Sequence, residues 1–476
     1  MENVLLSYLG GSSLSPHDGL GPAATVLQIG DYLIGVDYGL EFIPNGYGYP
    51  KHQTLNGHKI NKLILTHSHA DHVGSLFIGE DLGVFEDDMK ILASPQTHAI
   101  TSIVLDQSWS RFGQNVVLDQ TLRQVAKDYY SLNKIEARQR VLPLGEVELA
   151  PGIKAFVGYA GHIRGALYII IRTPKGKNIC FLGDHAWHKQ DTVEASEFPD
   201  DVPNEWLPDI MAQIDLTNPS LTSLDYNLVM SNFADHVKKC LDKKKVVVVL
   251  AFMNGRAQNA ALGLRRHGVE PVYCDGGGVK VFEILKAAKW SPKDKDFSLK
   301  GIKMITGGIA QRQELYARGG PLVIVTPSGM GDGGPVIDWF KMGLENPNFE
   351  FVGVSWTAPG SSMTKLTEKA RRRDSQKRAV YLKITDDRFP ENQDWDLPEK
   401  NYYKILCGVS RFHLSGHGGL GEQKLALEKI VKRRGRPLDL IVTTHGTQPS
   451  KRLCRSILGH LTQGLIAGNV GTQIPL

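Results

Sequence analysis

The segment LTHSHADHVG (residues 65–74) places three histidines and one aspartate in the six positions from His67 to His72. It follows the apolar run KLI, which is typical of a buried strand. His67 and His69 are separated by one residue, so on a strand end or tight loop their rings point to the same side. Asp71 and His72 follow where the next helix is expected to begin. The segment therefore predicts two adjacent metal sites, one at His67 and His69 and one at Asp71 and His72.

Imidazole and carboxylate ligands suit zinc, with manganese or iron as alternatives. A lone histidine on a strand is usually a packing or surface residue, but four ligand-type residues in six positions favour a metal. Further candidate ligands lie at other strand ends: His162 between glycines in GYAGHIRGA, Asp184 after CFLG, and His445 after LIVTT. Without the histidine segment, Asp184 would be better explained as a helix N-cap.

Several short runs of aliphatic and β-branched residues end abruptly at polar or glycine-rich segments, which is typical of strands buried on both faces. Amphipathic stretches between them, such as 256–268 and 421–435, predict helices. The fold class is therefore α/β with layered sheets, in which ligands gather beyond the carboxyl ends of strands. The expected strands lie within 62–69, 178–185, 246–256, 321–334, 349–356 and 438–446.

A chain of 476 residues exceeds what one hydrophobic core usually organises, so two domains are expected. Soft boundaries lie near 215–225 and 386–400. If these are the seams, the central block is an insertion and the two flanks belong together.

The formal charge of +5 is too small to establish an anionic partner. Basic clusters at 238–245, 369–378, 432–436 and 450–455 are explained as solvated faces or as surfaces for nucleic acid. Five separated cysteines without a CxxC pair indicate reduced thiols. The sequence shows neither a signal peptide nor an apolar run long enough to span a bilayer. We therefore expect a cytoplasmic protein with no membrane contact.

The combination of THSHADH with downstream GH, GD and HG resembles the metallo-β-lactamase fold, an αββα sandwich that holds two metal ions. The resemblance extends from residue 66 to residue 446. It implies that one zinc is held by His67, His69 and His162, a second by Asp71, His72 and His445, and that Asp184 bridges both.

More than half of the chain separates Asp184 from His445, which leaves room for an extra domain. Landmarks within it resemble the β-CASP nucleases, which insert an α/β domain into the metallo-β-lactamase domain. The matching segments are IDLTN (214–218, with Asp215), AFMNGRAQ (251–258), PSGMGDGGP (327–335) and FHLSGHGG (412–419). The implied division is 1–218 and 401–476 for the metallo-β-lactamase domain and 219–400 for the β-CASP domain.

His445 occupies a position where RNA-processing members of that family have histidine and DNA-processing members generally have valine. The resemblance therefore implies a zinc-dependent ribonuclease, with manganese as an alternative metal, that hydrolyses single-stranded RNA through a hydroxide bridging two metals. It leaves open a 5′-to-3′ exonuclease, an endonuclease or both. HLSGH is similar to ribonuclease J, whereas GRAQ and SGM are similar to the mRNA 3′-end processing endonucleases.

Asp184, Asp215 and His417 are the expected catalytic residues. His417, in the SGH segment, is the candidate for protonating the departing oxygen, because histidine titrates near neutral pH. Asp215 is expected to hydrogen-bond His417 and fix its tautomer. His185 and His188 are explained as surface residues in preference to hydrogen-bond donors near the site.

The glycine-rich loop can surround a phosphate with backbone amides, or it simply makes a tight turn. Lys365 could add positive charge near it. The residues expected to contact RNA are Ser328, Gly329, Gly333, Gly334, Arg256 and His413, the last with packing beside the loop as an equal alternative.

Two other functions remain open from the sequence. A small-molecule hydrolase of the lactonase or thioesterase type would share the metal ligands but would need neither the insert nor the pair Asp215 and His417. A non-catalytic RNA-binding scaffold would be expected to lack some of the ligands. The apolar C-terminal stretch 456–476 suits either a homodimer interface or a cap on the first domain.

Overall fold

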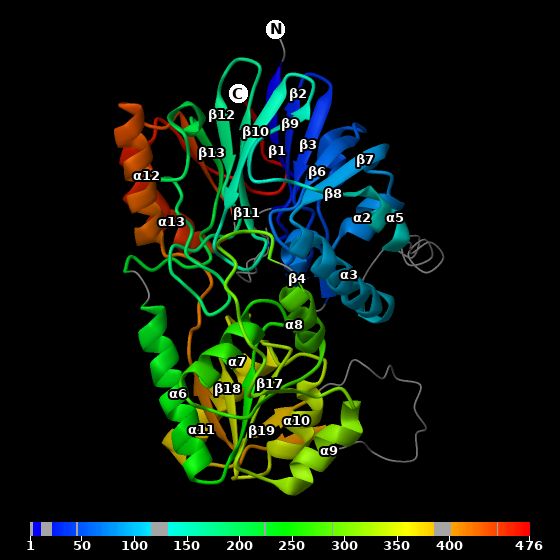
Figure 1. Ribbon diagram of the computed structural model, residues 1–476, viewed down its shortest axis with the longest axis vertical. Coiled ribbons are helices and arrows are strands. Elements are labelled where there is room, and N and C mark those ends of the chain that lie inside the picture. Colours follow the sequence, from blue (N-terminus) through cyan, green and yellow to red (C-terminus); the bar gives the residue numbers. More distant parts are fainter. Residues whose placement is uncertain are drawn as a thin grey trace.

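The structure, a computed structural model, has two bodies stacked along its longest axis (Figure 1). The upper body contains both ends of the chain, and the lower body is built from its middle. The described residues are 3–10, 21–43, 46–115, 132–222, 225–287, 289–384, 401–444 and 446–476.

The first sheet of the upper body has seven strands and contains the strand that leads into the histidine segment. In spatial order the strands are β24 (Gln473–Pro475), β1 (Val4–Tyr8), β2 (Thr25–Ile29), β3 (Tyr32–Val36), β6 (Ile60–Ile64), β7 (Phe85–Ala93) and β8 (Gln139–Val141). The pairings of β1 with β2 and of β2 with β3 are antiparallel, whereas β3, β6, β7 and β8 run parallel to one another.

The second sheet also has seven strands and joins the two flanks of the chain. β13 pairs directly and in parallel with β22, although the whole lower body lies between them in sequence. In spatial order the strands are β23 (Leu465–Ala467), β22 (Leu440–Thr443), β13 (Ile210–Ile214), β12 (Asn178–Phe181), β11 (Leu167–Arg172), β10 (Ile153–Tyr159) and β9 (Gly145–Ala150).

These two sheets pack face to face. One buried cluster combines Leu27 and Ile34 of the first sheet with Val157, Ile169 and Phe181 of the second. Alternate residues of a strand face opposite sides, and accordingly the neighbours of Ile169 belong to a different cluster, against the outer helices. The core of the upper body therefore lies between the two sheets.

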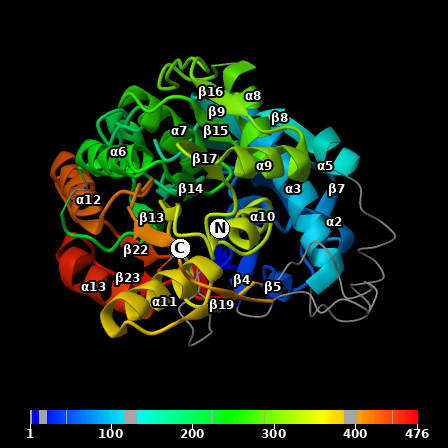
Figure 2. The same cartoon turned by 90° about the horizontal axis from the view of Figure 1, so that it is seen from below.

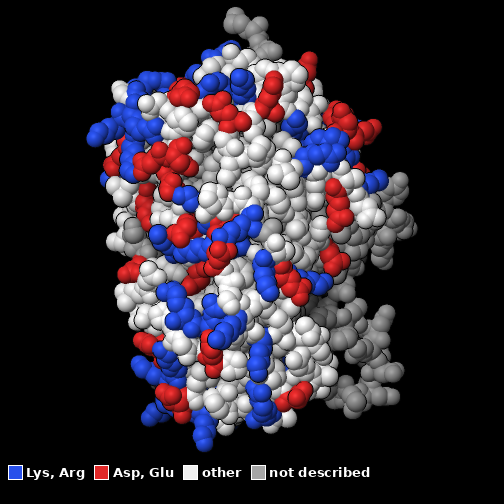
Figure 3. Space-filling model, in the orientation of Figure 1, with Lys and Arg blue, Asp and Glu red and all other residues white. Residues whose placement is uncertain are grey.

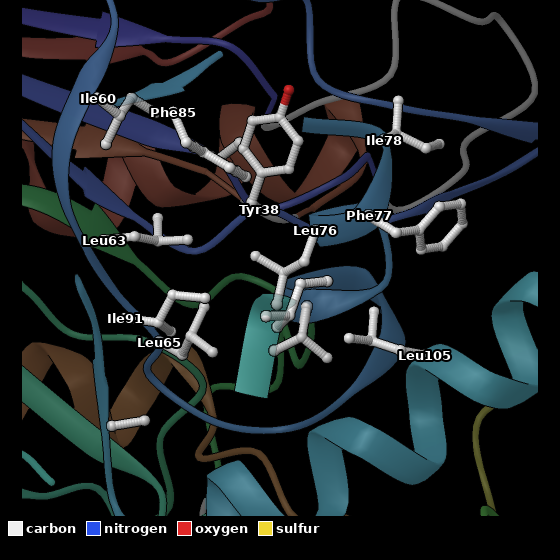
Figure 4. Close-up of a cluster of buried hydrophobic side chains, with 14 of the residues drawn as sticks. Tyr38, Ile60, Leu63, Leu65, Leu76, Phe77, Ile78, Phe85, Ile91 and Leu105 are labelled. Atoms are coloured by element: carbon white, nitrogen blue, oxygen red, sulfur yellow. The ribbon is translucent and has the colours of Figure 1, made fainter. Parts of the chain in front are cut away.

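Helices cover the two outer faces, so the upper body has four layers. Figure 4 shows the first of these interfaces, where Leu63 and Ile91 of the sheet meet Leu76 and Leu105 of the helices. The helices on this side are α1 (Ala70–Val73), α2 (Leu76–Asp81), α3 (Pro95–Asn115) and α5 (Leu132–Arg138); on the other side are α12 (Leu420–Arg434) and α13 (Gln448–Leu458). Short 3-10 turns are η1 (His52–Leu55), η2 (Asn204–Trp206) and η3 (Gly459–Leu461).

The lower body is built around a six-stranded sheet in which every pairing is parallel. Val247 and Val249 of its central strand face one core cluster, and Val246, Val248 and Leu250 face another. In spatial order the strands are β16 (Ile302–Met304), β15 (Val272–Cys274), β17 (Leu322–Thr326), β14 (Val246–Leu250), β18 (Phe349–Gly353) and β21 (Gly408–Arg411).

Helices cover both faces of this sheet, and Figure 2 shows them around the strands. Their ends follow ordinary capping chemistry: the side chain of Asp225 accepts from Leu228 N at the start of α6, and Ser361 accepts from Thr364 N at the start of α11. The helices are α6 (Tyr226–Asp242), α7 (Arg256–Arg266), α8 (Gly277–Ala287), α9 (Gly308–Arg318), α10 (Val336–Gly343) and α11 (Ser362–Gln376). The described residues also form two antiparallel two-stranded pairings, β4 (Glu41–Ile43) with β5 (Gly46–Gly48) and β19 (Tyr381–Lys383) with β20 (Tyr402–Lys404).

The expected α/β class is confirmed, and each apolar run singled out in the sequence contains a strand. The expected boundary segment 386–400 lies outside the described residues, and the division into domains stays a prediction. Strand β21 pairs with β18 in the lower body, so we propose a second seam at about residue 412.

The C-terminal stretch supplies an edge strand to each large sheet: β23 pairs with β22, and β24 pairs with β1. This position agrees with a role in capping the first domain, and a homodimer stays a prediction. All five cysteines are buried and free. Among the described helices, none combines the length and apolar character that a bilayer crossing demands.

The core between the sheets gives a test of the layer arrangement. Ile169→Ala is expected to lower the free energy of unfolding by about 2–5 kcal/mol, because it removes a fully buried side chain and leaves a cavity. The matched control is Leu425→Ala, since 58% of Leu425 is exposed on α12, and its loss should stay within about 0.5 kcal/mol. Urea denaturation followed by circular dichroism measures both, and equal losses would contradict the assignment of Ile169 to the core.

Candidate metal and catalytic site

The histidine segment lies where β6 ends and α1 begins. Leu65 continues the direction of the strand, with its N–H donating to Leu92 O at 2.9 Å. His69 is the N-cap residue of α1 and has an extended backbone, with φ −74° and ψ 152°. This short turn carries His67 and His69 to one side, as the spacing predicts, and places His72 on the first turn of the helix.

Three of the expected ligands converge with Asp184. The Nδ1 atom of His69 lies 3.1 Å from Nε2 of His67 and 3.1 Å from Nε2 of His162. The ligand atoms of these three histidines and of Asp184 all lie within 4.8 Å of one another. His162 comes from the loop after β10, and its Nδ1 donates to Gly416 O at 2.7 Å, which turns Nε2 toward the cluster.

The Asp184 carboxylate lies between two sets of imidazoles. Its Oδ2 is 3.4 Å from Nε2 of His67 and 3.6 Å from Nε2 of His162. Its Oδ1 is 3.4 Å from Nε2 of His72. One carboxylate oxygen thus faces His67 and His162, and the other faces His72.

Asp37 is a functional residue that the sequence interpretation missed. It follows β3, and its Oδ2 accepts from His72 Nδ1 at 2.7 Å, while Thr66 donates through N at 2.7 Å and through Oγ1 at 2.8 Å. A carboxylate on the far nitrogen of an imidazole orients the ring and fixes the tautomer of a metal ligand. The sequence signal that could have indicated Asp37 is its position directly after the apolar run LIGV, at the end of a strand that lies beside a parallel strand.

Two expected ligands are not part of this convergence. Asp71 lies in the first turn of α1, partly exposed, and outside the group formed by the three histidines and Asp184. His445 lies outside the described residues. The assignment of Asp71 and His445 to a second cation therefore stays a prediction.

The structure brings His417 and Asp215 together. Nδ1 of His417 donates to Oδ2 of Asp215 at 2.8 Å, and Oδ1 of the same carboxylate accepts from Thr217 N at 2.9 Å. Asp215 is buried just after β13, and Gln423 of α12 donates to its main-chain oxygen. The His417 ring packs on His162, with centroids 4.5 Å apart, so this pair borders the histidine cluster.

Electrostatics separates the histidines into two kinds. Burial, assisted by the neighbouring imidazoles, lowers the pKa of His67 and of His162 well below the usual range, and burial lowers the pKa of His69 to about 4. Burial also opposes protonation of His417, but Asp215 and Asp184 outweigh it and raise its pKa. The first three rings are therefore neutral at pH 7, as metal ligands must be, while His417 tends to keep its proton.

The cluster fits divalent cations. Burial would raise the pKa of Asp184, but His72, His417 and His67 lower it well below the usual range, so the carboxylate is charged. Its Oδ1 is buried and has no hydrogen-bond donor among the described residues. Neutral imidazoles around a buried, ionised carboxylate form the nitrogen and oxygen donor set that zinc prefers.

Arg256 does not meet the expectation that it contacts RNA. Only 4% of it is exposed, and its guanidinium donates to Leu414 O and His162 O at 3.1 Å each. The preceding Gly255 has φ 82°, and a Cβ there would lie 2.5 Å from Ile163. The NGRAQ segment thus holds the His162 loop against the His417 loop. The guanidinium of its arginine is hydrogen-bonded within the protein for this purpose.

His185 is buried and His188 is partly buried, so the surface interpretation is wrong for His185. The His185 ring packs against Trp187 and Phe198, and burial lowers its pKa to about 3. Nε2 of His188 donates to Ser415 O at 2.8 Å. His188 therefore supports the His417 loop, which is the alternative that the sequence left open.

The glycine-rich loop follows β17 and leads into α10. Ser328 and Gly334 are partly exposed, whereas Gly329 and Gly333 are buried. A Cβ at Gly329 would lie 3.0 Å from Phe252 and from Ser355, so this glycine is required for packing. Ser328 and Gly334 remain placed to meet a ligand. His413 is exposed and lies outside the histidine cluster.

Basic side chains are mixed with acidic ones on the face shown in Figure 3. In the cluster 432–436, Arg434 and Arg436 pair with Asp209 at 2.5 and 2.7 Å, and Arg433 donates to Pro199 O and Val202 O. These arginines stabilise the fold of the upper body and leave little charge for an anionic partner.

Comparison with known proteins adds relatives that cover most of the chain. A protein of Methanocaldococcus jannaschii named "Probable RNase" is 22% identical over 409 residues, covering 83% of this chain and 84% of its own length. A ribonuclease of Thermus thermophilus is 22% identical over 320 residues, 63% of this chain and 68% of its own. The chain is a relative of these ribonucleases.

Transcription termination factor FttA of Methanosarcina mazei is also similar, at 25% identity over 354 residues, or 69% of this chain. The match spans about half of that factor, 52% of its length. No protein-family model matches the chain. The resemblance to RNA-processing nucleases that the motifs suggested is confirmed by these relatives.

The division of roles within the site can be tested by metal content. His67→Ala is expected to lower the zinc bound per chain after reconstitution, because it removes one of the converging imidazoles. His417→Ala should keep the full content, since His417 is held by Asp215 and acts beside the cluster. Plasma mass spectrometry of the dialysed proteins measures both, and an equal loss in the two variants would show that His417 is itself a ligand.

Proposed function

We propose that the chain is a metal-dependent ribonuclease with a metallo-β-lactamase fold in the upper body and a β-CASP domain in the lower one. The observation that carries the proposal is the Asp184 carboxylate with His67 and His162 at one oxygen and His72 at the other, and the pair His417 and Asp215 beside it. The four layers of the upper body and the parallel sheet inserted after β13 support the named folds. The named relatives support RNA as the substrate.

The proposed ligands follow the sequence assignment, with two zinc ions and manganese as the alternative metal. A pair of divalent cations supplies a more acidic water and neutralises charge on the phosphate. The residues that would hold one cation are His67, His69 and His162, those for the other are Asp71, His72 and His445, and Asp184 would serve both.

His417 is the proposed proton donor to the departing oxygen of the phosphodiester. Its Nδ1 is committed to Asp215, so the proton passes from Nε2 to that oxygen. Asp215 stabilises the imidazolium before the transfer and fixes the tautomer after it. Both residues stand on loops that border the histidine cluster, and the packing of His417 on His162 supports this role.

RNA binding is proposed for the edge of the lower body that faces the site. Asn254 there contacts the histidine segment: its main-chain oxygen lies 3.2 Å from Nε2 of His69, and its side chain donates to Ser68 Oγ at 2.9 Å. Ser328 and Gly334, at the same carboxyl edge of the sheet, are the proposed phosphate contacts. A single strand of RNA lying in the seam between the bodies would reach both.

The function is tested with purified full-length protein, zinc or manganese, and labelled single-stranded RNA carrying a 5′-monophosphate or a 5′-triphosphate. Release of mononucleotides from the monophosphate alone would indicate 5′-to-3′ exonuclease action, and internal fragments from both would indicate endonuclease action. Intact RNA together with hydrolysis of a small ester or lactone would overturn the proposal.

His417→Ala is expected to slow RNA cleavage by about 10²–10⁴-fold through loss of the general acid. Because the protonated form is required and the pKa of His417 is raised, wild-type kcat/KM should fall only when pH rises above the usual range of histidine. The variant should lack this limb. His188→Gln is the control for disturbance of the loop, and a limb retained in His417→Ala would assign the proton to another group.

A further inference from the structure

A second group of metal-ligating side chains lies in the lower body, at the opposite edge of its sheet. His236 and Cys240 are one turn apart on α6, and Glu350 is the second residue of β18. Lys245, which immediately precedes β14, contacts this group, whereas Asn254, beyond the other end of β14, contacts the catalytic cluster. The five residues of β14 span roughly 16 Å, so the two groups are separate.

The spacing of the ligand atoms matches that around a tetrahedral cation. Nε2 of His236 lies 3.2 Å from Oε1 of Glu350 and 3.6 Å from Sγ of Cys240, and all three atoms lie within 4.8 Å of one another. Zinc bonds of about 2.3 Å to sulfur and 2.0–2.2 Å to nitrogen or oxygen separate tetrahedral ligand atoms by about 3.3–3.6 Å. The two distances from His236 fall close to this range, so a cation between the three side chains needs only small side-chain adjustments.

The surroundings orient these groups. Lys245 Nζ binds Oε2 of Glu350 at 3.0 Å, which leaves Oε1 facing His236. Cys240 and Glu350 are buried, whereas 29% of the His236 side chain is exposed, so a cation and a water ligand would enter from the imidazole side.

We propose that His236, Cys240 and Glu350 form a binding site for a divalent cation of the zinc type, distinct from the catalytic centre. Binding releases the thiol proton of Cys240 and any proton on His236, and the sulfur, nitrogen and carboxylate oxygen become ligands, with water as the fourth. Ser410 of β21 donates to the same Glu350 oxygen at 2.7 Å. The cation would therefore tie the first helix of the insert to its last strand.

Cobalt distinguishes this site from the catalytic one, because a Co²⁺ ion bound by thiolate has an intense near-ultraviolet charge-transfer band. The proposed catalytic ligands include no cysteine, so the band reports on Cys240 alone. Metal-free full-length protein titrated with Co²⁺ should develop the band, and Cys240→Ser should lose it together with one metal equivalent per chain. Cleavage of RNA should be unchanged in this variant.

Cys454→Ser is the matched control, since Cys454 is a buried thiol on α13 of the other body, and it should keep the band. His236→Gln, at a partly exposed position, provides a second variant should Cys240→Ser fail to fold, and it should weaken cobalt binding at least tenfold. A wild-type protein without the band, or a band that survives both Cys240→Ser and His236→Gln, would show that the three side chains form only a hydrogen-bonded network.

Discussion

The structure depends on the burial of one carboxylate. Asp184 lies at the end of a strand in a region closed to solvent, where an uncompensated charge would cost several kcal/mol. Imidazoles of His67, His72 and His162 surround it, and each comes from a segment that other contacts hold in place. The need to compensate this charge explains why polar residues occupy the ends of otherwise apolar strands. Asp184 and Asp37 in turn raise the pKa of His72 well above the usual range, whereas burial keeps His67 and His162 neutral. A charged oxygen beside these neutral rings makes the place suitable for cations.

Sheet topology determines which residues can meet there. β6 belongs to the first sheet, and β12 and β13 to the second, and the two sheets pack so that the ends of these strands converge. The insert begins after β13 and ends before β22. Both of its ends lie next to the histidine cluster, so the first turn of the insert and the loop that carries His417 border that cluster. The residues of the candidate site are thus contributed by segments from both sides of the insertion.

Much of this could be predicted from the sequence, because the information is local. Runs of β-branched residues define the strands, and the spacing from His67 to His72 defines the cluster. Contacts that depend on neighbouring chain segments could not be predicted. Asp37 looks like an ordinary strand-end aspartate until β3 is placed beside β6. Arg256 resembles a surface cation until the loops of His162 and Leu414 are seen to enclose it. Charge alone does not tell whether a guanidinium faces solvent or main-chain oxygens.

Arg256 also links the insert to the candidate site. It begins α7 of the insert, and its two terminal nitrogens bind the His162 loop of the upper body and the segment that precedes His417. A Cβ at Gly416 would lie 2.1 Å from this guanidinium, so the loop can approach only because glycine stands there. A shift of the insert against the upper body would therefore move the His162 loop and the His417 loop together. The relative position of the two bodies and the geometry of the candidate site are thus set by the same guanidinium.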